Sequence, residues 1–159
     1  MRKLMVLVAL LCALVAAATA GGAVAKSDVG KSKTLSGLSD ARVKVTLLKV
    51  VNDAKPEDFR EPKAGNRVVA LKLKLKNLTG ATYEDYVTNG AVLVDAKRKK
   101  HKAPALGAVE PHLGQIKLGK NGTATGWITF EVPEGVGISK FTYELNSGFG
   151  GQVATWKLK

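Results

Sequence analysis

The sequence predicts an all-β protein folded as an antiparallel β-sandwich. Several segments alternate apolar and polar residues with a period of two, which is the pattern of a strand buried on one face. Turn-forming stretches rich in glycine, proline and asparagine separate these segments. Beyond the N-terminal leader, no segment of helical length carries the i, i+3, i+4 apolar stripe of an amphipathic helix. Many short strands with turns between them are typical of two packed sheets.

Residues 1–20 have the organisation of a secretory signal peptide. Two basic residues follow the initial methionine, and residues 4–17 are apolar and uncharged. Small residues then allow cleavage after Ala20 or, alternatively, after Ala25. The apolar run is shorter than the roughly 20 residues that cross a bilayer comfortably. We therefore expect cleavage, no transmembrane segment in the mature chain, and a secreted, extracellular protein that is free or associated with the cell envelope.

The composition limits the chemistry of the mature chain. The only cysteine, Cys12, lies within the leader, so the mature chain has no thiol for a disulfide, a nucleophile or a metal ligand. The whole chain carries a net charge of +12 at pH 7, and loss of Arg2 and Lys3 with the leader leaves +10. Such a charge favours polyanionic partners: cell-wall polymers, anionic lipid surfaces, sulfated glycans or nucleic acid. For an exported protein, envelope polymers come first.

The elements can be placed in chain order. Residues 21–40, rich in glycine, alanine, serine and lysine, are expected to form a flexible tether that holds at most a short strand near residues 33–35. The sandwich domain is then expected to span residues 41–159. Its first strand begins at Arg42, where valine and leucine alternate with lysine and threonine. A change of parity predicts a β-bulge near residues 47–48.

Residues 67–76 form the clearest strand, because apolar side chains lie on one face and Lys72, Lys74 and Lys76 lie on the other. A helix would scatter these lysines around its circumference. The basic run at 97–102 is expected to form the turn of a hairpin. Further strands are expected at residues 91–95, 123–132, 141–145 and 155–158.

Three motifs resemble segments of a known family. Residues 64–77 (AGNRVVALKLKLKN) resemble its long strand, and residues 89–96 (NGAVLVDA) resemble its leucine-valine-aspartate hairpin strand. Residues 126–135 (GWITFEVPEG) resemble its glycine-x-x-x-phenylalanine-glutamate-valine-proline strand and turn, and the closing residues 156–158 also fit. Over roughly residues 31–159, the chain resembles the secreted bacterial immunoglobulin-like domains of unknown function that are typified by the mycobacterial immunoprotective extracellular protein.

This resemblance implies an immunoglobulin-like sandwich and an exported location, and it implies no reaction. Many members of the family carry a cysteine pair that braces the strand which here contains Trp127. The present chain lacks that pair, so any property that depends on a disulfide does not transfer to it.

The basic run is the sharpest candidate for a binding site. It consists of Lys97, Arg98, Lys99, Lys100, His101 and Lys102, with five formal positive charges in six residues. A hairpin tip of this kind would clamp a polyanion, and the lysine face of residues 72, 74 and 76 would extend it. The alternative is a solvated turn whose lysines protect a sheet edge from aggregation. Binding through these charges would be sensitive to salt.

Other classes of function find little support. His101 and His112 are the only histidines and are not spaced as a metal-binding pair, and basic residues and prolines interrupt the acidic residues between positions 53 and 61. No aromatic residue is interleaved with the basic run to stack on bases, which argues against nucleic acid as the ligand. Nucleophile elbows, phosphate-binding glycine loops and zinc-protease helices are absent from the sequence. We therefore expect no catalytic residues, no metal and no cofactor.

Two aromatic residues are candidates for contact with a protein or a glycan. Trp127 shares the polar parity of its strand with Thr125 and Thr129, so it is either exposed for such contact or covers a sheet edge. Phe149 lies in the glycine-rich segment 147–151 and is the best candidate for an anchor on a mobile loop.

These observations predict an exported, non-catalytic binding or adhesion module that acts at or outside the cell surface on an unknown partner. The alternative is a polyanion-associated or cell-wall-associated structural protein that is anchored through the basic hairpin.

Overall fold

The computed structural model describes residues 26–57, 60–105 and 107–159, so the predicted signal peptide lies outside the described residues. The short helical segments are η1 (Val87–Gly90) and α1 (Leu145–Gly148). The strands are β1 (Ser32–Ser36), β2 (Arg42–Val51), β3 (Asn66–Asn77), β4 (Tyr83–Tyr86), β5 (Ala91–Asp95), β6 (Lys100–Lys102), β7 (Gln115–Leu118), β8 (Thr123–Pro133), β9 (Ile138–Glu144) and β10 (Val153–Lys157).

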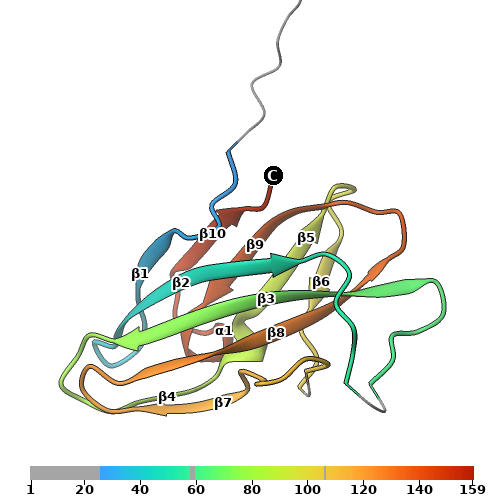
Figure 1. Cartoon of the computed structure of the whole chain (residues 1–159). Coiled ribbons are helices and arrows are strands. Elements are labelled where there is room, and N and C mark those ends of the chain that lie inside the picture. Colours follow the sequence, from blue (N-terminus) through green and yellow to red (C-terminus); the bar gives the residue numbers. More distant parts are fainter. Residues whose placement is uncertain (1–25, 58–59, 106) are drawn as a thin grey trace, which may run out of the picture.

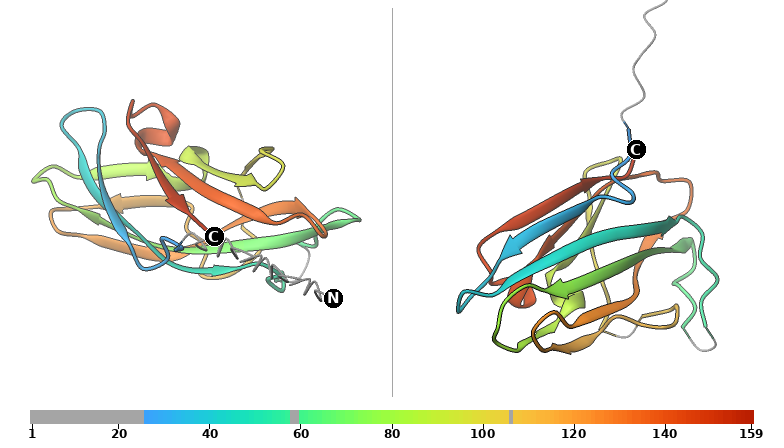
Figure 2. Two further views of the ribbon diagram at one scale, coloured as in Figure 1. Left: turned by 90° about the horizontal axis from the view of Figure 1, so that it is seen from above. Right: turned by 60° about the vertical axis from the view of Figure 1, so that its left-hand side comes forward.

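Two four-stranded antiparallel sheets pack face to face (Figures 1 and 2). The first sheet has the order β1-β2-β3-β8, and the second has the order β10-β9-β5-β6. A small two-stranded sheet, β4-β7, lies below β8 at one end of the sandwich (Figure 1). The predicted all-β antiparallel sandwich is therefore confirmed.

The register of the first sheet follows from the period-two pattern of its strands. Leu47 pairs with Leu73, and both side chains are fully buried, while the polar positions between the apolar ones face outward. The register shifts between Leu47 and Lys49, which confirms the predicted bulge. Beyond the bulge, β2 continues to pair with β3 as far as Val51 and Ala70.

Aromatic side chains fill the core between the two sheets. The Phe141 ring lies 6.3 Å from Phe130, 6.3 Å from Tyr143 and 5.5 Å from Trp156, measured between centroids. All four are fully buried, as the parity of their strands predicts. Offset and edge-to-face pairs at these separations stabilise a core beyond the effect of burial alone.

The short strand expected near residues 33–35 is present as β1, but it belongs to the sandwich, so the sandwich begins before the predicted boundary at residue 41. β1 pairs with β2 in the first sheet, and Leu35 is buried in the core opposite Val43. Before β1, the Gly30 amide also donates to the Leu47 carbonyl. The small and polar composition of this stretch resembles a linker, and among its described residues, 26–40, Leu35 is the only buried side chain.

Smaller differences concern the ends of the elements. The predicted hairpin is present, but residues 100–102 form strand β6, so the turn is confined to residues 96–99. β9 ends at Glu144, because Leu145 begins α1. The strands β4 and β7 were not expected, since each has only four residues.

Candidate functional site: a basic sheet face

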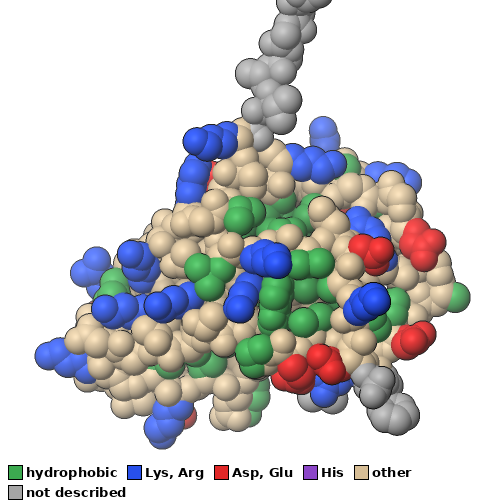
Figure 3. All heavy atoms as spheres, in the orientation of Figure 1, with side chains coloured by type: hydrophobic (Ala, Val, Ile, Leu, Met, Phe, Trp, Pro, Cys, Tyr) green, Lys and Arg blue, Asp and Glu red, His purple; other side chains and the backbone are tan. Residues whose placement is uncertain are grey.

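The outer face of β2 and β3, which we call the basic face, carries a continuous set of cations. These two strands contain no acidic residue. Figure 3 shows Lys and Arg side chains across the left and centre of this side of the molecule, whereas the acidic side chains gather at its right and lower right. The cations of the basic face are Arg42, Lys44, Lys49, Lys72, Lys74 and Lys76.

Strand pairing places like charges directly opposite one another on the basic face. Lys44 lies opposite Lys76, and Lys49 lies opposite Lys72. Within the described part of the chain, none of the six cations forms a salt bridge. Like charges directly opposite across an antiparallel pair destabilise it. These pairs thus oppose folding, and an anionic ligand on the basic face would relieve the repulsion.

Trp127 adjoins the basic face on β8. It lies directly opposite Lys72, whose Nζ is 5.5 Å from the centroid of the indole ring. A cation at this distance over an indole is attracted to the ring. The next positions along β8 on the same face are Thr125, opposite Lys74, and Thr123, opposite Lys76. The half-buried Trp127 thus continues a surface of lysine and threonine side chains.

The basic hairpin tip is organised by a buried acid that the sequence analysis did not single out. Asp95 is 2% exposed and accepts hydrogen bonds from the amides of Lys97 (2.8 Å) and Lys99 (2.9 Å). Its other oxygen is 2.9 Å from Nε2 of His101. The hydrogen bond with His101, followed by those from the two backbone amides, lowers the pKa of the Asp95 carboxyl. Asp95 therefore fixes the turn, and the side chains of residues 97–99 project into solvent.

The hairpin does not extend the lysine face, contrary to expectation. Lys100 and Lys102 pair with Val94 and Val92 on the outer face of the second sheet. The lysines of β3 are on the outer face of the first sheet, so the core separates the two sets. His101 points inward, where it is 8% exposed. The reason is the period of two in β6, which sends its lysines outward and its histidine toward the core.

Phe149 is 76% exposed on the loop between β9 and β10. A second buried acid holds this loop: Asp85 of β4, which is 5% exposed. Oδ1 of Asp85 accepts hydrogen bonds from the Ser147 amide (2.7 Å) and hydroxyl (3.0 Å). Oδ2 accepts hydrogen bonds from the hydroxyls of Tyr83 (2.6 Å) and Tyr143 (3.3 Å). This role could not be predicted from sequence patterns, because Ser147 lies 62 residues from Asp85.

The tyrosines of this cluster are held in their neutral form. Burial, together with the nearby Asp85 carboxylate, raises the pKa of both Tyr83 and Tyr143 well above the ordinary tyrosine value. Asn146 and Ser147 both have positive φ, 55° each, which is uncommon for residues other than glycine. Asp85 therefore stabilises a backbone conformation that this loop would otherwise disfavour.

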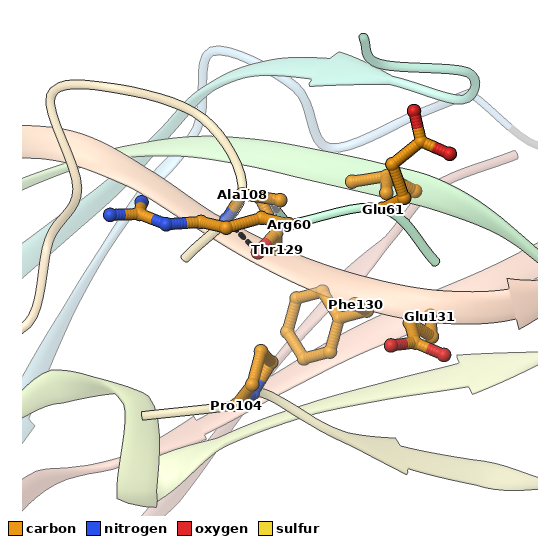
Figure 4. Close-up of a pocket in the computed structure, with 8 residues that line it drawn as sticks. Arg60, Glu61, Pro104, Ala108, Thr129, Phe130 and Glu131 are labelled. Atoms are coloured by element: carbon orange, nitrogen blue, oxygen red, sulfur yellow. Dashed lines mark hydrogen bonds between the residues drawn. The ribbon is translucent and has the colours of Figure 1, made fainter. Parts of the chain in front are cut away.

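A cavity of about 200 Å³ opens beside β8 (Figure 4). Val68, Pro104, Ala108 and Phe130 supply apolar lining, and the Ala108 amide donates to Oγ1 of Thr129 (3.0 Å). The charged ends of Arg60 and Glu61 point away from the Phe130 ring (Figure 4). Arg60 is engaged outside the cavity by the Gly107 carbonyl and by Glu110. The charged ends of Arg60 and Glu61 thus diverge, and Glu131, the third charged residue of the lining, accepts a hydrogen bond from Nδ2 of Asn66 (3.2 Å).

His112 lies near this cavity with its ring between two glycines. A Cβ added to Gly107 would lie 2.3 Å from Cδ2 of the ring, and one added to Gly114 would lie 3.0 Å from Cε1. Nε2 of His112 is buried and has no hydrogen-bond partner among the described residues. Burial lowers the pKa of His112 and outweighs the opposing effect of Glu110.

We expect the domain to lose stability as the pH falls below about 6.5, because of His112. The unfolded chain takes up this proton near pH 6.5, whereas the folded chain resists it until a lower pH, so acidification favours unfolding. Chemical denaturation at about pH 7.5 and about pH 5.5 measures the change above the range in which carboxyl groups titrate. His112→Gln should reduce the difference, and an unchanged difference in this variant would contradict the assignment.

The described residues contain no helix that is both long and apolar enough to cross a membrane. In the same part of the chain, no group of three or more His, Cys, Asp and Glu side chains is arranged to hold a metal ion.

The two packed antiparallel sheets make the protein a small β-sandwich, and sequence comparison places the chain in a family. Residues 29–154 match the family described as a domain of unknown function, DUF4352. The chain belongs to this family, and the resemblance drawn from the sequence motifs is confirmed. No curated protein matches the chain significantly.

Solved structures share the fold at low sequence identity. The secreted protein MPT63 of Mycobacterium tuberculosis is 12% identical, with 82% of this chain and 94% of that chain covered and a TM-score of 0.59. The yjhA protein of Bacillus subtilis is 11% identical, with 84% and 100% covered and a TM-score of 0.59. The ycdA protein of Bacillus subtilis, a candidate lipoprotein, is 14% identical, with 80% and 38% covered and a TM-score of 0.61. At these identities the similarity shows the fold alone.

Proposed function

We propose that the protein is an exported, non-catalytic binding module that attaches to an anionic polymer of the cell envelope through its basic face. The observation that carries this proposal is the presence of two like-charge pairs across the strands, Lys44 opposite Lys76 and Lys49 opposite Lys72. A solvent-facing strand position does not require lysine, so a surface that opposes folding in this way is best explained by a ligand of the opposite charge.

Four further observations support the proposal. Trp127 provides a ring beside Lys72 on which a sugar or a polymer backbone can lie. The threonines opposite Lys74 and Lys76 add hydroxyl donors for anionic oxygens. At the cavity beside β8 the charged ends of Arg60 and Glu61 diverge, an arrangement that favours binding over catalysis. MPT63, which shares the fold, is described as secreted, in keeping with the expected export of this chain.

The experiment is a binding titration of the mature protein with poly(glycerol phosphate), with neutral dextran as the control polymer. The variant Lys72→Gln/Lys74→Gln/Lys76→Gln is expected to bind about 100-fold more weakly, since each lysine near an anionic surface contributes about 1 kcal/mol. Affinity of the parent should fall as salt rises. The variant should be at least as stable as the parent, because it removes the like-charge pairs.

The matched control is Lys55→Gln/Lys63→Gln/Lys120→Gln, which loses the same charge from exposed positions outside the basic face. It should bind almost as well as the parent. Equal losses in both variants would show that only net charge matters and would contradict a defined face. A loss confined to Lys97→Gln/Arg98→Gln/Lys99→Gln would instead assign the polymer to the hairpin, the alternative site.

A further inference from the structure

The outer face of the second sheet carries apolar side chains where a solvent-facing strand usually carries polar ones. In β5, Leu93 points into the core, and Val92 and Val94 lie on the outer face, where Val92 is half-buried and Val94 is 7% exposed. An apolar run without alternation is typical of a strand that is covered on both faces. Val153 of the edge strand β10 also faces outward and is 58% exposed. Among the described residues, no further layer covers this face.

These side chains line a hollow of about 420 Å³, within the size range of small-molecule sites. The hollow lies over β5, β9 and β10, the strands of the rear sheet in Figure 1. Besides the three valines, it is lined by Gly90, Lys100, Lys140, Thr142, Tyr143, Glu144 and Thr155.

The strand register gives this hollow a cationic end and an apolar end. Lys100 and Lys140 flank Val94 on its two neighbouring strands, and Lys157 lies opposite Lys140. These positions form one row of three lysines across the sheet. Lys140 and Lys157 form another like-charge pair that opposes folding.

The next rows along the strands have a different character. Val92 lies opposite Thr142, which in turn lies opposite Thr155, so methyl groups form the middle of the hollow. On its other side Val92 lies opposite the exposed Lys102 of β6, which does not line the hollow. In the last row, Val153 lies opposite Glu144, whose carboxylate accepts a hydrogen bond from the Gly151 amide (2.7 Å). An anionic group would therefore be attracted to the lysine row and repelled from the Val153 end.

We propose that this hollow binds a single-chain anionic amphiphile, with its acidic head at Lys100, Lys140 and Lys157 and its alkyl chain along Val92 and Val153. A flexible polyanion would leave the valines uncovered. A second copy of the chain would bring two lysine-rich faces together and meet strong like-charge repulsion. The amphiphile matches both the charge at one end and the apolar surface at the other. This proposal is independent of polymer binding at the basic face.

The experiment is a titration of isotope-labelled mature protein with dodecanoate, kept below its critical micelle concentration and followed by two-dimensional NMR. Saturable shifts are expected for the amides of Val92, Thr142, Val153 and Thr155. Dodecyltrimethylammonium, with the same chain and the opposite charge, should bind at least about tenfold more weakly. Acetate, which has the head but no chain, should produce no saturable shifts at the same concentrations.

Two variants separate the two ends of the site. Lys140→Gln/Lys157→Gln removes the head contacts, and Val92→Thr/Val153→Thr keeps the β-branched shape but removes apolar surface. Each is expected to weaken dodecanoate binding about tenfold. Lys72→Gln/Lys74→Gln/Lys76→Gln on the opposite face is the matched control. It should bind dodecanoate like the parent, although its binding to poly(glycerol phosphate) is weakened.

Several results would overturn the proposal. Equal affinity for dodecanoate and its cationic analogue would remove the role of the lysine row. Shifts centred on Leu38 and Phe149, which are exposed at one end of the sandwich, would place the amphiphile elsewhere. Binding of an acidic peptide to the Val92 and Val153 face without any binding of dodecanoate would replace the amphiphile by a protein partner.

Discussion

The Leu73→Asp substitution is expected to unfold the domain. Leu73 is fully buried at the middle of β3, opposite Leu47 on β2 and Gly126 on β8. An unpaired carboxylate in such an interior lowers the stability of the fold by several kcal/mol. The lost leucine packing lowers it by about 2–5 kcal/mol more. A small domain is stable by only about 5–15 kcal/mol in total. Circular dichroism on heating should therefore show no cooperative transition for the variant.

Lys74→Asp is the matched control, because it places the same side chain at the next position of the same strand. Lys74 is exposed on the basic face, opposite Thr46 and Thr125. This variant should fold and melt near the parent temperature, while its affinity for poly(glycerol phosphate) falls. If Leu73→Asp melted like Lys74→Asp, the burial assigned to the two faces of β3 would be wrong.

The Asp85→Ala substitution is expected to produce the second largest loss of stability. It would leave the hydroxyls of Tyr83 and Tyr143 and both donors of Ser147 without their acceptor. An unpaired buried donor costs about 1–3 kcal/mol, and since some of these groups can reach water, we expect about 2–5 kcal/mol in total. Equilibrium denaturation with urea measures this loss. Amide hydrogen exchange should also show faster exchange in residues 145–150.

Two variants test whether the effect comes from the buried acceptor. Glu84→Ala removes the neighbouring acid, whose salt bridge with Lys117 is largely exposed, and it should change stability by less than about 1 kcal/mol. Asp85→Asn keeps one oxygen for Ser147, and the tyrosine hydroxyls can accept from its amide, so its loss should be smaller than that of alanine. Equal stability of Asp85→Ala and Glu84→Ala would exclude a structural role for the Asp85 cluster.

The strands that alternate over many residues could be predicted from the sequence. In β3, four apolar residues and three lysines repeat with a period of two, and only a strand places each set on one face. The bulge could likewise be predicted, because the alternation of apolar and polar residues changes parity at Leu47-Leu48. β4 and β7 could not be placed in this way, because four residues give too few repeats to distinguish a strand from a loop, and β1 was expected only as a short strand within a tether.

Only part of the candidate site could be predicted from the sequence. The lysines of β3 and the indole of Trp127 were identified, but their neighbours Lys44 and Lys49 reach the same face only through the pairing of β2 with β3. Pairing also separated the hairpin from that face, since β6 joined the other sheet. The structural role of Asp85 could not be predicted, because its partner Ser147 comes from a loop distant in sequence. Contacts between residues so distant in sequence depend on how the strands are connected and paired.

The turn held by Asp95 has a consequence for the entropy of binding at the hairpin tip. Its backbone is already fixed by the hydrogen bonds from the Lys97 and Lys99 amides, and Arg98 occupies a left-handed conformation between them. A ligand that contacts these three side chains would need to order only their rotamers, whereas a flexible basic tail would also lose backbone freedom. The tip therefore presents its charges as a preorganised group with a set spacing, and it would select among anions by the distance between their charges as well as by their number.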